Sequence, residues 1–238
     1  MCDWLIKTVK LLLLVQNRTK EKILQSKKIH TDDTTVNLIK NSTGKNNKNV
    51  KTSRIWTYVG NKEHNYTVYD FTENRKSEGP ENFLIDYKGY LQADAYSSYD
   101  QIYAKGIIKE VGCWAHARRY FKNIEDIAPE KCVTALCIIQ KLYKIETEVK
   151  GLTYEEIKAA RQEKSLPILK AFRDWLIEES RIELPKSQLN KAINYCLNNY
   201  DSLMVYTQEG FLDIDNNEAE RAIKPIVIGR KNWLFFYK

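Results

Sequence analysis

The sequence has no long hydrophobic segment, and this absence excludes a protein held in a membrane by its own helices. Its longest aliphatic run, residues 11–15, has five residues, whereas a transmembrane helix needs about 20. No small-residue cleavage site follows this run, which argues against a signal peptide. Apolar residues at helical spacing around it predict an amphipathic N-terminal helical segment within residues 1–27.

Glycine, proline, cysteine and histidine are all scarce. Nine glycines and five prolines among 238 residues exclude collagen-like and linker-dominated chains. The five cysteines are an odd number at irregular spacing, so we expect a reducing cytoplasm rather than a secreted disulfide framework. Only three histidines are present, and the motifs G-x-S-x-G, H-E-x-x-H and the glycine-rich nucleotide loops are missing. These absences argue against serine hydrolases, zinc peptidases of that type and nucleotide-binding proteins.

Positive charge is in excess. The chain has 38 Lys plus Arg against 31 Asp plus Glu, a formal net charge of +7 and an isoelectric point near 9.0. This balance favours an anionic partner, although a charge of this size does not identify nucleic acid by itself.

The middle of the chain changes from strand-like to helical patterns. β-Branched and aromatic residues predict five strands, at residues 29–36, 54–59, 66–71, 89–94 and 107–113. Residues 40–51 predict an exposed basic loop. After residue 115, apolar residues recur every three or four positions, and prolines and a glycine divide them into about four helices. Strands that precede the helices favour an α/β protein with a mixed sheet of about five strands.

Three acidic residues stand out because of their neighbours. Asp32 lies in the first predicted strand, Asp94 at the end of the fourth, and Glu220 in the last helix. A carboxylate on a central strand is costly unless a cation neutralises it, so acidic residues at strand ends often mark metal sites. The alternatives are a turn or cap role for Asp32, a helix N-cap role for Asp94, and a surface pair between Glu220 and Lys224.

The last helix has its own start and stop signals. Asp215 and Glu218 have the spacing of a capping box, which would make Asp215 the N-cap and leave Glu220 as the free carboxylate. Pro225 predicts an end or a kink after about two turns. Residues 229–236 combine basic and aromatic side chains, which fits either a phosphate or base contact or a buried strand with a basic start.

A second dense cluster occupies residues 113–119. Arg118 and Arg119 are interpreted as phosphate contacts, with a solvated helix face as the alternative. A zinc site of three cysteines and one histidine can also be written, but its last two cysteines are five residues apart in a helical stretch, an unusual spacing for ligands. Its members would be Cys113, His116, Cys132 and Cys137.

Taken in order, these clusters resemble the transposases of the insertion sequence 66 family. The matching stretches are residues 29–34 (IHTDDT), 53–59 (SRIWTYV), 89–99 (GYLQADAYSSY), 112–120 (GCWAHARRY) and 215–235 (DNNEAERAIKPIVIGRKNWLF). The resemblance implies a ribonuclease H-like catalytic domain interrupted by a helical insertion. It also implies a catalytic, metal-binding triad of Asp32, Asp94 and Glu220 that cleaves and joins DNA with two Mg²⁺ ions, Mn²⁺ being a substitute.

The same resemblance implies DNA contacts, partners and domain limits. The DNA contacts would be His116, Arg118, Arg119, Arg221, Arg230 and Lys231. The partners would be transposon ends, target DNA and further copies of the chain, in the cytoplasm at the nucleoid. The expected domains are the N-terminal segment 1–27, a core of 28–117, a helical insertion of 118–210, and the closing part of the core at 211–238.

Members of this family typically extend further on both sides, so the chain is expected to be a shortened copy. Two alternatives to an active transposase follow. One is a catalytically inactive DNA-binding remnant, and the other is a metal-dependent nuclease that cuts DNA without joining it.

Overall fold

The computed structural model describes residues 3–40, 49–233 and 236–237. The chain divides into two compact units. The sheet unit contains residues 1–91, 96–109 and 217–238, and the helical unit contains residues 92–95 and 110–216. The domain limits expected from the sequence stay a prediction.

A mixed β-sheet forms the first unit's scaffold. Its main strands follow the order β3-β2-β1-β4-β5, and β6 pairs with β1. The strands are β1 (Lys28–Lys40), β2 (Asn49–Val59), β3 (Thr67–Thr72), β4 (Gly89–Gln92), β5 (Ile108–Val111) and β6 (Phe236–Tyr237). The pairs β1–β2 and β2–β3 are antiparallel, whereas β1–β6 is parallel. The five predicted strands and the α/β class are therefore confirmed, and β6 is an addition.

The first hairpin is longer than the sequence predicted. Leu38 pairs with Lys51 and Val36 with Ser53, so residues 49–51 of the predicted basic loop belong to β2. An antiparallel ladder satisfies backbone groups whatever the polarity of the side chains, which explains why polar residues continue the strand. Residues 41–48 of the predicted loop lie outside the described residues.

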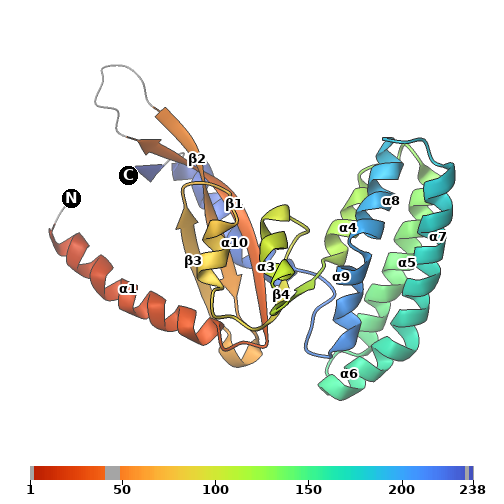
Figure 1. Ribbon diagram of the computed structural model, residues 1–238, viewed down its shortest axis with the longest axis horizontal. Coiled ribbons are helices and arrows are strands. Elements are labelled where there is room, and N and C mark those ends of the chain that lie inside the picture. Colours follow the sequence, from red (N-terminus) through yellow and green to blue (C-terminus); the bar gives the residue numbers. More distant parts are fainter. Residues whose placement is uncertain (1–2, 41–48, 234–235, 238) are drawn as a thin grey trace. The chain divides into compact units, whose positions relative to one another are not determined.

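Four α-helices accompany this sheet in the described part of the unit. They are α1 (Asp3–Ile23), α2 (Glu78–Phe83), α3 (Asp100–Ala104) and α10 (Asn217–Trp233). The helix α10 packs against β1 and β2, and α1 contacts β3 (Figure 1). The predicted N-terminal helix is confirmed, but Leu11, Leu14 and Val15 on it are more than 60% exposed, so this apolar run is not part of the core.

The helix α10 differs from its prediction in three ways. It begins at Asn217, two residues after the predicted N-cap Asp215. It continues through Pro225 to Trp233, so the proline does not end it, because packing on β1 and β2 offsets the lost backbone hydrogen bond. Residues 229–233 are consequently helical and not a strand, and residues 234–235 lie outside the described part.

The second unit is a bundle of α-helices. Its main helices are α4 (Trp114–Lys122), α5 (Pro129–Glu148), α7 (Leu166–Ile182) and α8 (Gln188–Asn198), with the shorter α6 (Tyr154–Ala160) and α9 (Tyr200–Met204). Helix α4 contacts α5 and α8, and α7 contacts the same two, so the four pack around one core (Figure 1). Trp114, Phe121 and Phe172 are fully buried there. The unit thus has more helices than the four or so predicted.

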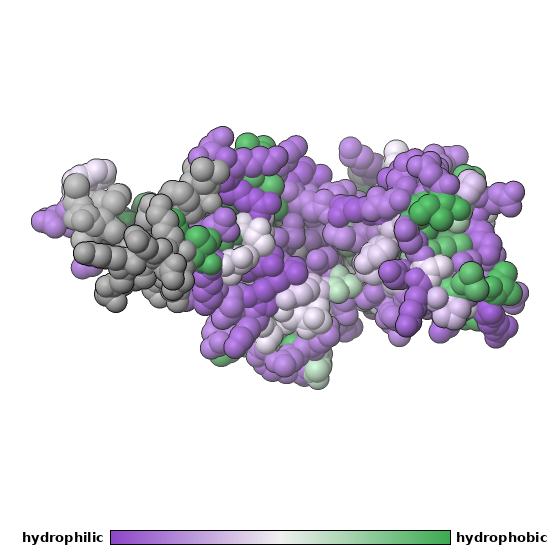
Figure 2. Space-filling view, turned by 90° about the horizontal axis from the view of Figure 1, so that it is seen from above, coloured by the Kyte–Doolittle hydropathy of each residue, from purple (hydrophilic) through white to green (hydrophobic). Residues whose placement is uncertain are grey.

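The face seen in Figure 2 is mostly hydrophilic, with separate hydrophobic patches. None of the helices in the described ranges is long and apolar enough to cross a membrane.

Candidate active site

The two neighbouring aspartates of β1 point to opposite faces of the sheet. Successive side chains of a strand alternate between its two faces, so Asp32 shares a face with His30 and Thr34, whereas Asp33 shares the other with Thr31. The two side chains therefore have different neighbours.

The face of Asp33 is a closed ion-pair network. The Asp33 side chain is only 2% exposed and accepts hydrogen bonds from Arg54 Nη1 (2.9 Å) and from Arg75 Nη2 (2.7 Å) and Nε (3.1 Å). The Arg75 guanidinium in turn lies 3.4 Å from the centre of the Tyr96 ring. The Arg75 carbonyl oxygen accepts from the hydroxyls of Tyr96 and Ser98. Charge and hydrogen bonds on Asp33 are thus used to hold the fold together.

The face of Asp32 is covered by α10. The register places Asp32 opposite Thr57 and Thr57 opposite Tyr69, so these side chains form one row across three strands. The Tyr69 hydroxyl donates to the carbonyl oxygen of Ala222 in α10 (2.7 Å). The helix therefore crosses the sheet above the row that contains Asp32.

Two further contacts fix the direction of α10 along β1. His30 Nε2 lies 4.0 Å from Glu218 Oε2, and Arg230 Nη1 donates to Thr34 Oγ1 (2.6 Å). The helix therefore runs along the strand in the same sense. Asp32 lies between the two contact points on β1, and Glu220 lies between them on α10. The structure thus places both predicted residues within the zone where α10 covers β1.

The surroundings of Asp32 combine a half-buried carboxylate with a buried hydroxyl. Asp32 is half-buried, and its Oδ1 accepts the backbone N–H of Asp33 (2.8 Å). Beside it, the fully buried Thr57 hydroxyl has no hydrogen-bond partner among the described residues. Buried hydroxyls normally have one, so this orphan fits a site completed by water or a hydrated ion. The sequence analysis missed Thr57, because its relation to Asp32 comes only from the pairing of β1 with β2.

Asp94 belongs to the helical unit, in the short segment that follows β4. Its side chain is half-buried. No helix begins at the next residue, since the first turn after it starts at Ser97, and Tyr96 is the N-cap there. The alternative role of Asp94 as a helix N-cap is therefore wrong.

The predicted DNA contacts fall into two groups. Arg221 and Lys231 are exposed on α10, and His116, Arg118 and Arg119 lie on α4. Arg230 is half-buried instead, and its Nη1 also donates to the Thr35 carbonyl oxygen (2.7 Å).

Lys224 is a basic residue of α10 that the sequence analysis did not assign to DNA. It is exposed and makes no ion pair with Glu220 or any other described residue. The signal was available, because Arg221, Lys224 and Lys231 follow helical spacing along one side of α10.

The alternative zinc site is wrong for the described residues. The Cys113 Sγ accepts the backbone N–H of Asn216 (3.2 Å), the buried Cys132 thiol lies 3.7 Å from the Ile124 carbonyl oxygen, and Cys137 is exposed. Burial raises the pKa of the Cys113 thiol to about 11. Among the described residues, the four members of this site do not form a group whose ligand atoms could hold one metal ion together.

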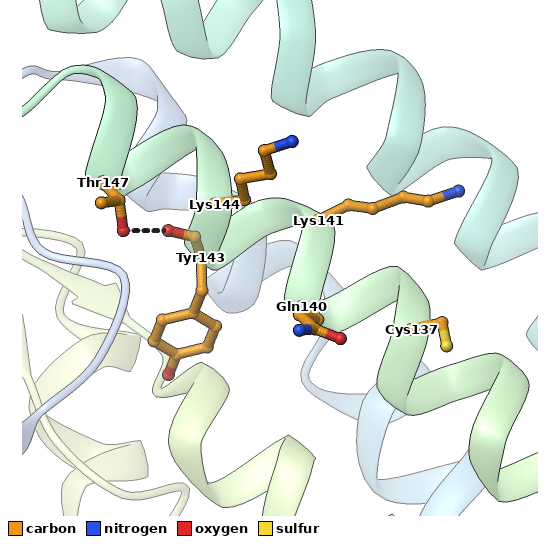
Figure 3. A pocket seen from close by; sticks show the side chains of 6 residues that line it. All are labelled: Cys137, Gln140, Lys141, Tyr143, Lys144 and Thr147. Atoms are coloured by element: carbon orange, nitrogen blue, oxygen red, sulfur yellow. Dashed lines mark hydrogen bonds between the residues drawn. The ribbon is translucent and has the colours of Figure 1, made fainter.

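A surface pocket of about 530 Å³ lies elsewhere, on α5. Its lining residues are Cys137, Gln140, Lys141, Tyr143, Lys144 and Thr147 (Figure 3). The Tyr143 ring points to one side of the helix and the two lysines to another, while Thr147 donates to the Tyr143 carbonyl oxygen (3.0 Å). None of the predicted catalytic residues lines this pocket.

Fold and site together define an α/β protein with two acidic residues where its last helix covers the sheet. The family model described as Transposase IS66 family matches residues 1–238. The chain belongs to this family, as its motifs predicted.

Two relatives from Sinorhizobium fredii (strain NBRC 101917 / NGR234) are similar to the chain. The uncharacterized protein y4hP is 30% identical over 237 residues, which cover 90% of this chain and 42% of y4hP. The uncharacterized protein y4qI is 30% identical over 231 residues, with the same two shares. The chain therefore spans less than half the length of these relatives.

Proposed function

We propose that this chain is the catalytic core of a DDE transposase that cleaves DNA and joins the cut strand to target DNA. Asp32, Asp94 and Glu220 would be its catalytic carboxylates. The observation that carries the proposal is the difference between the two faces of β1. Asp33 forms ion pairs with Arg54 and Arg75, whereas Asp32 faces the helix that carries Glu220. Family membership makes DNA the expected partner.

The strand arrangement supports a ribonuclease H-like core. Three strands form an antiparallel meander, and β4 and β5 extend the sheet on the other side of β1. The Tyr90 N–H donates to the Lys27 carbonyl oxygen (3.0 Å), so β1 and β4 start together. Asp32 lies on β1, and Asp94 follows the end of the neighbouring strand β4 by two residues.

The donor set suits a hard divalent cation. Mg²⁺ prefers carboxylate oxygens and keeps several waters, and the orphaned Thr57 hydroxyl beside Asp32 is a suitable partner for such a water. Asp32, Asp94 and Glu220 would hold the ions. Divalent ions in such sites lower the pKa of an attacking water and stabilise the charge of the leaving oxygen.

The residues of the chain would contribute positioning and charge. Asp32 on a strand and Glu220 on a packed helix are held by rigid elements, which keeps the carboxylates in a fixed geometry. Three carboxylates in one site would repel one another, so such a site would favour cations before any DNA is bound. The Tyr69 and Arg230 contacts would keep Glu220 over the sheet.

The outer side of α10 would bind the DNA backbone. Arg221, Lys224 and Lys231 are exposed and have no ion-pair partner among the described residues. They span ten residues, or about 15 Å of helix, which is enough to reach two or three successive phosphates. We assign Arg230, which bonds to Thr34 and Thr35, to holding α10 rather than to DNA. His116, Arg118 and Arg119 on α4 would be additional contacts.

A cleavage and strand-transfer assay tests the proposal. The protein is incubated with labelled element-end DNA and target DNA, with Mg²⁺ or with EDTA, and compared with Glu220→Gln, which keeps the shape of the side chain but removes its charge. Mg²⁺-dependent cleavage and joined product, both lost in the variant, are expected. DNA binding without cleavage would indicate an inactive remnant, and cleavage without joining a nuclease; either result would overturn the transposase assignment.

A further inference from the structure

Three motifs far apart in the sequence meet within the helical unit. They are the segment around Gln92, the segment around Cys113, and residues 213–216, which lead directly into α10. The sequence analysis gave roles to single residues of these motifs but not to their meeting point.

Gln92 is at the centre of this junction. It is the last residue of β4, and its side chain is fully buried. Its Nε2 donates to the carbonyl oxygen of Asp213 (2.7 Å) and lies 3.4 Å from the carbonyl oxygen of Gly112. Gln92 thus joins the end of the strand that precedes Asp94 to the segment that precedes α10.

The amide of Gln92 is only half satisfied. Its Oε1 is buried and has no partner among the described residues. A buried acceptor without a partner is costly, and an apolar side chain of the same size would avoid that cost. Stability alone therefore does not explain a glutamine at this position. The two hydrogen bonds that its Nε2 donates, which hold the neighbouring segments in place, explain it better.

Neighbouring contacts hold the same segment from other directions. The backbone N–H of Trp114 donates to the Ile214 carbonyl oxygen (3.1 Å), and the Tyr143 hydroxyl donates to Asp215 Oδ2 (3.0 Å). Further back, the buried Arg161 donates to the carbonyl oxygens of Glu209 (2.8 Å) and Leu212 (3.0 Å). Residues 209–215, which precede α10, are therefore held by several hydrogen bonds within the helical unit.

We propose that Gln92 is a positioning residue that holds the Asp94 carboxylate in place within the helical unit. Asp94 is two residues after Gln92, and the hydrogen bonds of Gln92 tie this segment to Asp213 and Gly112 of the same unit. Loss of these bonds would therefore let the proposed metal-binding carboxylate of Asp94 shift. This inference rests on the proposed catalytic triad.

The test is the Mg²⁺ dependence of DNA cleavage by Gln92→Met. Methionine keeps the length of the side chain and removes both hydrogen bonds. Loss of an outer-shell partner typically costs about 10–100-fold in metal affinity or activity. We expect the Mg²⁺ concentration for half-maximal cleavage to rise by about tenfold or more, while DNA binding in EDTA is unchanged.

A matched control separates positioning from stability. Ile193→Val also alters a fully buried side chain of the helical unit, but Ile193 lies on α8, away from the junction. Both variants are assayed at a temperature at which circular dichroism shows them folded. An unchanged Mg²⁺ dependence in Gln92→Met, or an equal rise in Ile193→Val, would overturn the inference.

A second variant covers the case in which Gln92→Met does not fold. Tyr143→Phe removes only the hydroxyl that donates to Asp215 and should raise the half-maximal Mg²⁺ concentration by a smaller factor. No rise in a folded Tyr143→Phe would then count against the inference. If the wild-type protein shows no Mg²⁺-dependent cleavage, the proposed function itself fails, which is a different outcome from cleavage that is insensitive to Gln92.

Discussion

The two faces of β1 give two adjacent, chemically identical side chains different environments. On one face Asp33 is almost inaccessible and bound by Arg54 and Arg75. On the other, Asp32 is half-buried beside the orphaned Thr57 hydroxyl and below the helix that carries Glu220. The comparison shows that an acidic pair in a sequence need not act as a pair, because alternation along a strand gives each member a different environment.

The largest expected effect comes from Asp32→Asn. Removing the charge would remove a metal ligand while leaving the shape of the side chain, so cleavage should fall on the order of 10³-fold, equivalent to about 4 kcal/mol of activation free energy. Stability should change less than in Asp33→Asn, because the Asp33 carboxylate is the one that holds Arg54 and Arg75. Single-turnover cleavage and urea unfolding measure the two quantities. Near-normal cleavage by Asp32→Asn would show that Asp32 is not a catalytic metal ligand.

Asp33→Asn should show the reverse pattern. The substitution leaves two arginines without their carboxylate, which should lower the free energy of unfolding by about 2–3 kcal/mol. Cleavage per folded molecule should stay near the wild-type value. Urea unfolding checks the first statement, with the exposed Asp126→Asn as a control that should be neutral. A stable Asp33→Asn protein without cleavage would reverse the roles of the two aspartates.

A smaller effect is expected from Arg75→Lys. Lysine keeps the positive charge but cannot make the two-pronged bond to Asp33 or stack its planar group on Tyr96. The free energy of unfolding should fall by about 1 kcal/mol. If thermal unfolding is unchanged, the network on this face contributes less than its geometry indicates.

The smallest effect separates the two sides of α10. Lys224→Gln should reduce the salt dependence of DNA binding, lowering the slope of log K against log salt by about 0.9. Arg230→Gln should leave that slope unchanged, since Arg230 bonds to β1. Binding titrations at several salt concentrations give both slopes. Equal reductions in the two variants would show that both side chains contact phosphates.

The sequence predicted the five main strands and the α/β class because alternation and β-branched residues are local signals. It could not predict the row Asp32–Thr57–Tyr69, because register depends on pairing between distant segments. It misplaced the end of the last helix, because the packing that carries α10 past Pro225 is a tertiary effect. Asp32 and Glu220 were predicted from family motifs, whereas the different fate of Asp33 became visible only with Arg54 and Arg75 in place.

The most direct measurement is Mn²⁺ binding, followed by electron paramagnetic resonance or calorimetry, for the wild type, Asp32→Asn and Asp33→Asn. Each protein is titrated together with element-end DNA under conditions in which it is folded. The account predicts that the wild type and Asp33→Asn bind the ion with similar affinity and that Asp32→Asn loses this binding. Binding that survives in Asp32→Asn but disappears in folded Asp33→Asn would contradict it.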